Sequence, residues 1–255
     1  MPTTQHLRAQ IEATLAEKIP SALTPLPRAP YSLVSTGIRE IDELLHGGLP
    51  AGAISEIVGP ECSGRTSLAL ALVAGMTRAG KVCAWVDVSD TLHPESAAAI
   101  GVDLARLLWI RCGASSDKGK PRSKSWSRLA QALRVTDLLL QAGGFSCIVL
   151  DMGSLNAEFA LRVPLATWFR FRAAAERLQA NVLLLTQHAC AKSSAALVLR
   201  LDPGGVLTQD STIFAGLEHQ AEVARRRSAG NVLPLRKPPQ SVHTAQWQAP
   251  WAGRR

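Results

Sequence analysis

Long apolar segments are missing from this chain of 255 residues. No uninterrupted apolar run reaches the roughly 18 residues that a membrane-spanning helix needs. Residues 1–8 also lack the basic-then-apolar order of a secretion signal. We therefore expect a cytoplasmic protein with no membrane partner.

Cysteine is scarce as well, and none of the five cysteines belongs to a CxxC pair. Three of them lie inside apolar segments, which favours reduced thiols in a core over metal ligands. Hydrophobic residues make up 47% of the chain and charged residues 19%, the balance of a globular protein. Most of the chain should therefore fold, as one large α/β domain or as a core with a modest appendage.

The net charge of +8 is unevenly distributed. Residues 111–134 hold seven Lys or Arg against one Asp, and residues 217–255 hold seven against two acidic residues. Such segments favour a polyanionic partner, most simply DNA. The alternative is a solvated loop and a basic tail that keep the protein soluble. Composition leaves both interpretations open.

Three regions follow from the residue patterning. Residues 1–31 combine a short amphipathic helix, over residues 5–18, with a linker that carries four prolines. Residues 32–236 form the core. Residues 237–255 contain three prolines and few aliphatic residues, which favours a basic tail that is disordered or folds on a partner.

The core alternates strand-like and helix-like segments. Strands alternating with helices specify an α/β fold whose mostly parallel sheet is covered by helices on both faces. Successive strands without a helix between them predict an antiparallel extension near the C-terminus. The parallel strands are expected at 53–58, 82–88, 107–111, 147–150 and 181–186, the helices from 65, 93 and 127 and over 167–178, and the later strands at 195–201, 212–217 and 220–227.

A glycine-rich loop follows the strand that ends at Val58 and opens the next helix. It has the spacing G-x-x-x-x-G-K-[ST], with arginine in place of lysine at position 65. In such a loop the backbone N–H groups converge on phosphates, and the helix N-terminus favours the anion. The alternative is a strand-to-helix turn without a ligand. The predicted nucleotide-binding residues here are Gly59, Pro60, Glu61, Cys62, Ser63, Gly64, Arg65, Thr66 and Ser67.

A candidate Mg²⁺ site accompanies the loop. The Thr66 hydroxyl is placed to bind the ion, and Asp151, which closes the strand at 147–150, supplies the matching carboxylate. The arginine at 65 affects binding and catalysis differently. Its planar guanidinium can bind phosphate oxygens, but it is larger than an ammonium group and cannot occupy the same position beside the β- and γ-phosphates. We expect nucleotide binding to persist and hydrolysis to falter.

Further short motifs follow in a fixed order, and together they resemble the bacterial recombinase RecA family over roughly residues 32–244. The resemblance implies a RecA-like P-loop NTPase core that uses ATP and Mg²⁺. It assigns Asp151 as the Walker B aspartate and Gln187 as the side chain that senses the γ-phosphate. It also implies RecA-like subunits, or copies of itself, and single-stranded DNA as partners. The motifs are Ser35-Thr36-Gly37, Gly47-Gly48-Leu49-Pro50, Glu56-Ile57-Val58-Gly59-Pro60-Glu61, Val86-Asp87, Leu92-His93-Pro94 and Gly101-Val102-Asp103.

Several positions depart from the family pattern. The family's catalytic glutamate corresponds to Ser89, so Asp90 is the nearest carboxylate, and we take Asp90 and Gln187 as the candidate catalytic residues. A serine cannot polarise water as a carboxylate does. The family's adenine-stacking aromatic corresponds to Ser96, and the two DNA-binding loops are shortened or nearly absent. The resemblance therefore implies ATP binding, and it leaves ATP hydrolysis in question.

Two basic positions of the family pattern are retained. Arg225 and Arg227 match side chains that reach the ATP of a neighbouring subunit in the family's filament, and they are counted among the nucleotide-binding candidates. Their alternation places both on one face of a strand. The alternatives are binding to a DNA backbone and simple solvation.

The chain resembles the ImuA-type family of RecA-related accessory proteins in its replaced catalytic residues, its shortened DNA-binding loops and its basic tail. Such proteins work beside a Y-family-like polymerase subunit in mutagenic translesion synthesis. The resemblance implies an ATP-binding accessory role in DNA repair and SOS-type damage tolerance, with weak or no ATPase activity. The alternative is a DNA-dependent ATPase and single-stranded-DNA-binding recombinase of homologous recombination.

Overall fold

The structure, a computed structural model, describes residues 6–7, 32–113, 121–209, 213–227 and 244–250. The chain divides into two units, and the larger one, Ser32–Arg227 with Ser241–Arg255, contains every assigned strand. The expected N-terminal helix and proline-rich linker lie outside the described residues, except for His6 and Leu7, which are helical. None of the described helices is both long and apolar enough to cross a bilayer.

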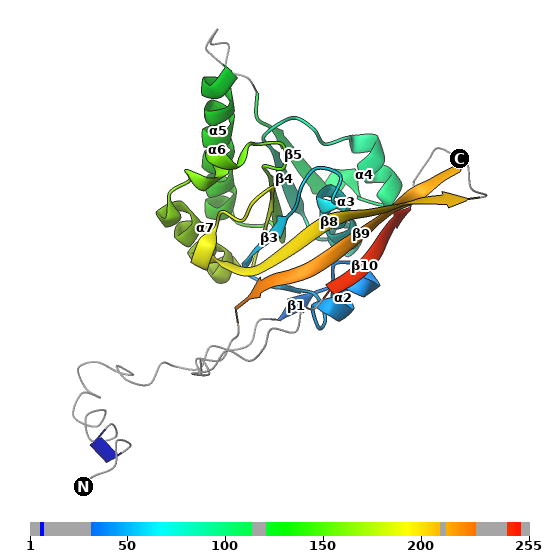
Figure 1. Ribbon diagram of the computed structural model, residues 1–255. Helices are drawn as coiled ribbons and strands as arrows, with labels where there is room; N and C mark the ends of the chain where they lie inside the picture. Colours follow the sequence, from blue (N-terminus) through cyan, green and yellow to red (C-terminus); the bar gives the residue numbers. More distant parts are fainter. Residues whose placement is uncertain (1–5, 8–31, 114–120, 210–212, 228–243, 251–255) are drawn as a thin grey trace. The chain divides into compact units, whose positions relative to one another are not determined.

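An eight-stranded sheet organises the larger unit, in the order β10-β9-β8-β3-β7-β6-β4-β5 (Figure 1). Neighbours from β8 to β5 run parallel, whereas β8, β9 and β10 pair antiparallel. The predicted α/β fold with an antiparallel C-terminal extension is confirmed. The strands are β3 Ile54–Val58, β4 Cys83–Asp87, β5 Leu107–Arg111, β6 Cys147–Asp151, β7 Asn181–Thr186, β8 Ala195–Gln209, β9 Ile213–Arg226 and β10 Thr244–Pro250, with a separate pair, β1 Leu33–Val34 and β2 Leu49–Pro50.

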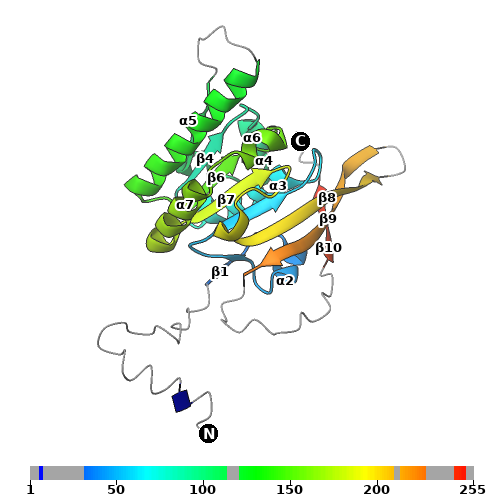
Figure 2. The same cartoon turned by 60° about the vertical axis from the view of Figure 1, so that its left-hand side comes forward.

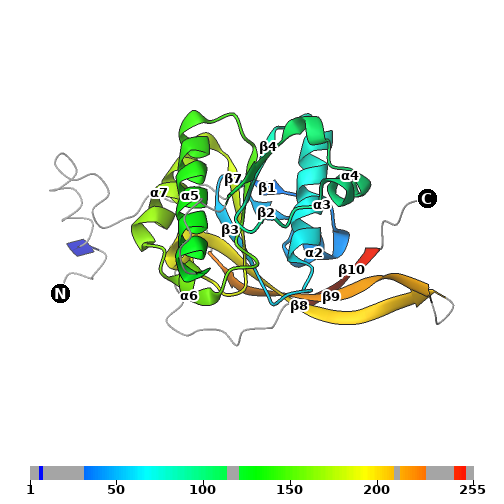
Figure 3. The same ribbon diagram turned by 90° about the horizontal axis from the view of Figure 1, so that it is seen from above.

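Helices cover both faces of this sheet (Figures 2 and 3). On one face α2, α3 and α4 pack on the strands, and on the other α5, α6 and α7 do so. Because both faces are covered, every residue of β3, β4, β6 and β7 is buried, as expected of parallel strands. The helices are α2 Arg39–Leu44, α3 Arg65–Arg78, α4 Pro94–Ile100, α5 Pro121–Ala142, α6 Ala157–Leu161 and α7 Leu165–Leu178, with 3₁₀ turns at Leu104–Arg106 and Lys192–Ser194.

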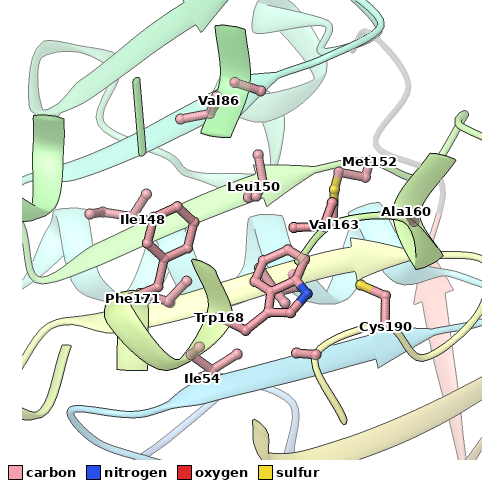
Figure 4. Close-up of a cluster of buried hydrophobic side chains, with 14 of the residues drawn as sticks. Ile54, Val86, Ile148, Leu150, Met152, Ala160, Val163, Trp168, Phe171 and Cys190 are labelled. Carbon is pink, nitrogen blue, oxygen red and sulfur yellow. The ribbon is translucent and has the colours of Figure 1, made fainter. Parts of the chain in front are cut away.

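The α5–α7 face holds the larger aromatic side chains. Trp168 and Phe171 of α7 are fully buried, and their rings meet edge to face at 5.9 Å. They lie over Ile148 and Leu150 of β6 and Ile54 of β3 (Figure 4). Because Ile54 is followed within five residues by the glycine-rich loop, this packing anchors the strand that presents the loop.

Two sequence expectations near the C-terminus are wrong. Residues 213–226 form one strand, β9, instead of two, because pairing with β8 and β10 continues through Glu218 and His219. Residues 244–250, expected to lack regular structure, form strand β10 along β9. Trp247, at 2% exposure, anchors this strand in the core. The scarcity of aliphatic residues therefore did not indicate a lack of regular structure.

Smaller differences concern helices. Helix α5 begins at Pro121, six residues before the expected start, so Arg122 and Lys124 of the basic segment 111–134 lie in a helix. Helix α6 was not predicted, because its five residues are too short for a periodic signal. Two further basic residues of this segment, Lys118 and Lys120, lie outside the described residues.

Candidate nucleotide-binding site

The glycine-rich loop lies between β3 and α3, in the predicted strand-loop-helix arrangement. Helix α3 starts after Gly64, which has left-handed backbone angles and provides no side-chain cap. The first turn of α3 contains no acidic residue. Since the first N–H groups of a helix have no partner within it, this end is suited to an anion.

Two glycines of the loop are required by close approach. A Cβ at Gly59 would lie 2.2 Å from the carbonyl oxygen of Leu201. A Cβ at Gly64 would lie 2.8 Å from carbon atoms of both His219 and Trp247. The loop is therefore clamped between β8 on one side and the C-terminal strands on the other.

A cavity of about 390 Å³ opens at the loop. The sequence predicted its floor but not its opposite wall, which comes from β9 and β10. Ser96, at the position of the family's adenine-stacking aromatic, also lines it. The lining residues are Cys62, Ser63, Gly64, Arg65, Thr66, Ser67, Ser96, Ile100, Phe214, Leu217, His219 and Ala249.

His219 and Trp247 contact the loop at Gly64. Their ring centroids are 4.7 Å apart, and both side chains are 2% exposed. Burial lowers the pKa of His219, so its ring is neutral at physiological pH. Sequence analysis missed both residues because their proximity to Gly64 depends on the pairing of β9 with β10.

Arg65, the only cationic residue of the loop, is buried at 8% exposure. Its Nη2 donates a hydrogen bond to the carbonyl oxygen of Gly153 over 3.2 Å. Its Nη1 is buried and has no hydrogen-bond partner among the described residues. Burial lowers the pKa of Arg65, and the nearby carboxylates of Asp151 and Glu61 oppose that shift. The guanidinium thus points toward the end of β6.

Asp151 closes β6 and is 7% exposed. Its Oδ1 accepts the Gly153 N–H over 3.0 Å. Burial raises the pKa of Asp151 to about 6, and the Gly153 hydrogen bond and Arg65 act in the opposite direction. A Cβ at Gly153 would lie 3.1 Å from both Arg65 Nη1 and Asp151 Oδ1, so the two charged groups flank this glycine.

Thr66 and Asp151 offer the oxygen ligands that Mg²⁺ prefers. Thr66 is exposed at the cavity. The described residues contain no cluster of three or more His, Cys, Asp or Glu that could hold a metal. The oxygen ligands fit a magnesium ion. The Arg65 guanidinium does not, because it already lies beside Asp151 and would repel a second positive charge.

Two carboxylates at the end of β4 and just after it have their own partners. Asp87, fully buried, accepts the backbone N–H groups of Ser89, Thr91 and Leu92 and the indole N–H of Trp109. Asp90 pairs with Arg111 through two hydrogen bonds of 2.6 Å, which lower the pKa of Asp90. Asp90 is not among the described residues that line the cavities at the loop.

Gln187 lies closer to the loop than Asp90 does. Its Nε2 donates to the same Gly153 carbonyl oxygen as Arg65, over 3.2 Å. Gln187 also lines a second cavity, of about 580 Å³, together with Gly59, Pro60 and Arg225. The structure thus brings one candidate catalytic residue, Gln187, to the loop.

The short segment after Gln187 is held from several sides. Glu56, buried in β3, accepts the N–H groups of Cys190 and Ala191 over 2.8 Å each. Arg225 and Arg227 donate from β9 and its end to the carbonyl oxygens of Lys192 and Ser193. Both arginines therefore contact their own chain, and their proposed reach to a neighbour's nucleotide stays a prediction.

Fold and site together define a P-loop protein with a mixed α/β sheet. A model of the RecA N-terminal domain matches residues 10–160, more than half of the chain, and the chain belongs to this family. The protein RecA of Acidothermus cellulolyticus is 38% identical over 148 residues, which are 58% of this chain and 39% of that protein. The protein RecA of Saccharopolyspora erythraea is 38% identical over 144 residues, 56% of this chain and 38% of that protein.

The chain therefore spans about two-fifths of the length of the curated relatives it matches. A crystal structure of the RadB recombinase aligns with a TM-score of 0.56 over 85% of this chain and 96% of that chain. The identity is 19%, so this likeness concerns the fold. It agrees with the parallel sheet and its antiparallel extension.

Proposed function

We propose that this protein is a RecA-like, ATP-binding accessory factor in DNA repair and SOS-type damage tolerance, of the ImuA type, with weak or no ATPase activity. The observation that carries the proposal is the placement of Arg65. Its guanidinium is hydrogen-bonded to the Gly153 carbonyl and lies beside Asp151. A lysine at this position would instead have a small ammonium group free to contact the phosphate during transfer.

The missing water-orienting carboxylate supports the same proposal. Ser89 occupies the position of the family's glutamate, and Asp90 is engaged by Arg111. No Asp or Glu is among the described residues lining the 390 Å³ cavity. Without a carboxylate to orient water, hydrolysis would lose a factor on the order of 10²–10⁴.

ATP is the proposed nucleotide, and Thr66 and Asp151 are the residues that would hold Mg²⁺ if it accompanied ATP. RecA-like subunits or copies of this chain, and a Y-family-like polymerase subunit, are the proposed protein partners. Single-stranded DNA is a further proposed ligand. The short segment from His188 to Ser194, fastened by Glu56, supports contacts with DNA that are weaker than those of a long binding loop.

The second candidate function is a DNA-dependent ATPase and strand-exchange recombinase. Gln187 favours it, since this side chain lies at the end of β7 beside the loop and lines the second cavity. The sequence similarity to proteins named RecA also favours it, although it covers only part of their length.

ATP binding and turnover by the purified chain, with and without single-stranded DNA, separate the two functions. The accessory proposal expects ATP binding without DNA-stimulated turnover, and Asp151→Ala serves as the control for activity that originates at this site. Robust DNA-stimulated hydrolysis that Asp151→Ala removes would replace the accessory proposal by the recombinase.

A further inference from the structure

We propose that the Arg65 guanidinium takes the electrostatic place of Mg²⁺ at Asp151, so that the chain binds nucleoside diphosphates and triphosphates without a divalent cation. The inference rests on the proposed function, because it requires a nucleotide at the glycine-rich loop. It adds that Arg65, which opposes turnover, is at the same time the cation on which binding depends.

The position of the guanidinium is the first argument. Arg65 begins helix α3, yet its side chain extends to the end of β6 and is 8% exposed. The hydrogen bond from Nη2 to the Gly153 carbonyl oxygen holds it there. Gln187 donates to the same oxygen, which fixes the acceptor from a second direction. The guanidinium is thus placed before any ligand enters.

The balance of charge is the second argument. In a magnesium site a carboxylate such as Asp151 complements a divalent ion, either directly or through its water ligands. Here the carboxylate and the guanidinium already flank Gly153, at 3.1 Å each from the point where its Cβ would stand. A divalent ion added at this place would be repelled by a buried positive charge at short range.

Unused hydrogen-bond donors are the third argument. Arg65 Nη1 is buried and has no partner among the described residues. The Ser63 hydroxyl, 1% exposed, also lacks a partner in that part of the chain. The Ser63 hydroxyl, which lines the cavity, and the N–H groups of the uncapped helix can donate to phosphate oxygens, and the Arg65 guanidinium supplies the positive charge. A buried donor left unpaired is destabilising, and a phosphate oxygen would relieve this.

Binding of ADP and of ATP, measured by calorimetry in excess EDTA and again in excess Mg²⁺, tests the inference. For the unaltered chain we expect the two dissociation constants to agree within about threefold. The matched variant is Arg65→Lys, whose compact ammonium cannot reach both partners of the guanidinium. Its affinity is expected to fall by about tenfold or more when EDTA replaces Mg²⁺.

A second pair of variants tests the position of the guanidinium independently. In Gly153→Ala the added Cβ would lie 3.1 Å from both Arg65 Nη1 and Asp151 Oδ1, so the guanidinium and the carboxylate are pushed apart by a few tenths of an ångström, and binding in EDTA is expected to weaken by about tenfold. Gly75→Ala is the control, because Gly75 lies in the same helix as Arg65 and its added Cβ would meet nothing within 4 Å beyond its chain neighbours and the backbone of that helix. Its binding is expected to be unchanged.

The outcomes separate the inference from the proposed function. If the unaltered chain binds nucleotide in Mg²⁺ but loses tenfold or more in EDTA, the inference is overturned and nucleotide binding stands. If it binds nucleotide under neither condition, both fail. If it binds equally in both and Arg65→Lys does so too, the guanidinium is not the responsible cation.

Discussion

Arg65 and Gln187 donate hydrogen bonds to one carbonyl oxygen, that of Gly153, each over 3.2 Å. The first residue comes from the glycine-rich loop and the second from the end of β7. A ligand that moved the Arg65 side chain would therefore change the environment of Gln187. Gln187 directly precedes the segment that Glu56 and Arg225 hold. The Gly153 carbonyl oxygen therefore connects the nucleotide site, through Gln187, with that segment.

Gly64→Ala should disrupt the site and the fold together. The added Cβ would lie 2.8 Å from His219 and Trp247, and an alanine would have to adopt left-handed backbone angles. We expect a loss of about 1–3 kcal/mol in the free energy of unfolding, measured by urea denaturation. Nucleotide binding should disappear. A variant with unchanged stability would show that β9 and β10 do not press on the loop.

Trp247→Ala tests whether the C-terminal strand belongs to the core. Trp247 is 2% exposed and packs against His219, so its removal leaves a cavity beside the loop. The expected loss in the free energy of unfolding is about 3–5 kcal/mol. The neighbouring exposed residue provides the control, since Gln248→Ala should change stability by less than about 0.5 kcal/mol. Equal effects of the two variants would argue against a docked strand.

Asp151→Asn should stabilise the protein near neutral pH. Burial raises the pKa of Asp151 to about 6, above the roughly 3.9 of an unfolded chain. The folded state therefore binds the proton more tightly, and stability falls as the pH rises from about 4 through 6. The neutral asparagine removes this loss, which should raise the free energy of unfolding by about 1–3 kcal/mol at neutral pH. The measurement is urea denaturation of both proteins across this pH range. The prediction is contradicted if the free energy of unfolding changes with pH in Asp151→Asn as much as in the unaltered chain.

Asp90→Asn should leave the nucleotide site unaffected. Asp90 is bound to Arg111 and is absent from the described lining of both cavities. Asparagine also tolerates the positive φ of 60° found at this position. The dissociation constant for ATP and any residual turnover should stay within about twofold of the unaltered chain. A turnover rate that collapsed would instead restore Asp90 as the catalytic carboxylate.

Local sequence signals predicted much of the fold. The strands expected at 107–111 and 181–186 match β5 and β7 from end to end. Strand β7 is buried throughout, because a parallel strand covered on both faces is mostly apolar, whereas β5 lies at the edge of the sheet and ends in Arg111. The glycine-rich loop was recognisable because its function depends on spacing within eight residues. Helix α3 followed from the same motif.

Prediction was poorer where an element depends on one distant contact. The strand β10 has a single fully buried anchor, Trp247, whose partner His219 is 28 positions earlier and is supplied by the pairing of β9 and β10. Likewise, the orientation of Asp90 depends on Arg111 at the end of the adjacent strand, 21 positions away. Neither contact leaves a periodic pattern in the sequence.

The sequence by itself determined the class of fold and the presence of a phosphate-binding loop, because both follow from local spacing and strand hydrophobicity. Only the tertiary structure decided what surrounds Arg65. The Gly153 carbonyl that orients its guanidinium lies 88 positions away, and the rings beside Gly64 come from β9 and β10. Long-range backbone pairing brings these groups together, and the direction of a buried charge depends on its whole surroundings and not on its neighbours in sequence.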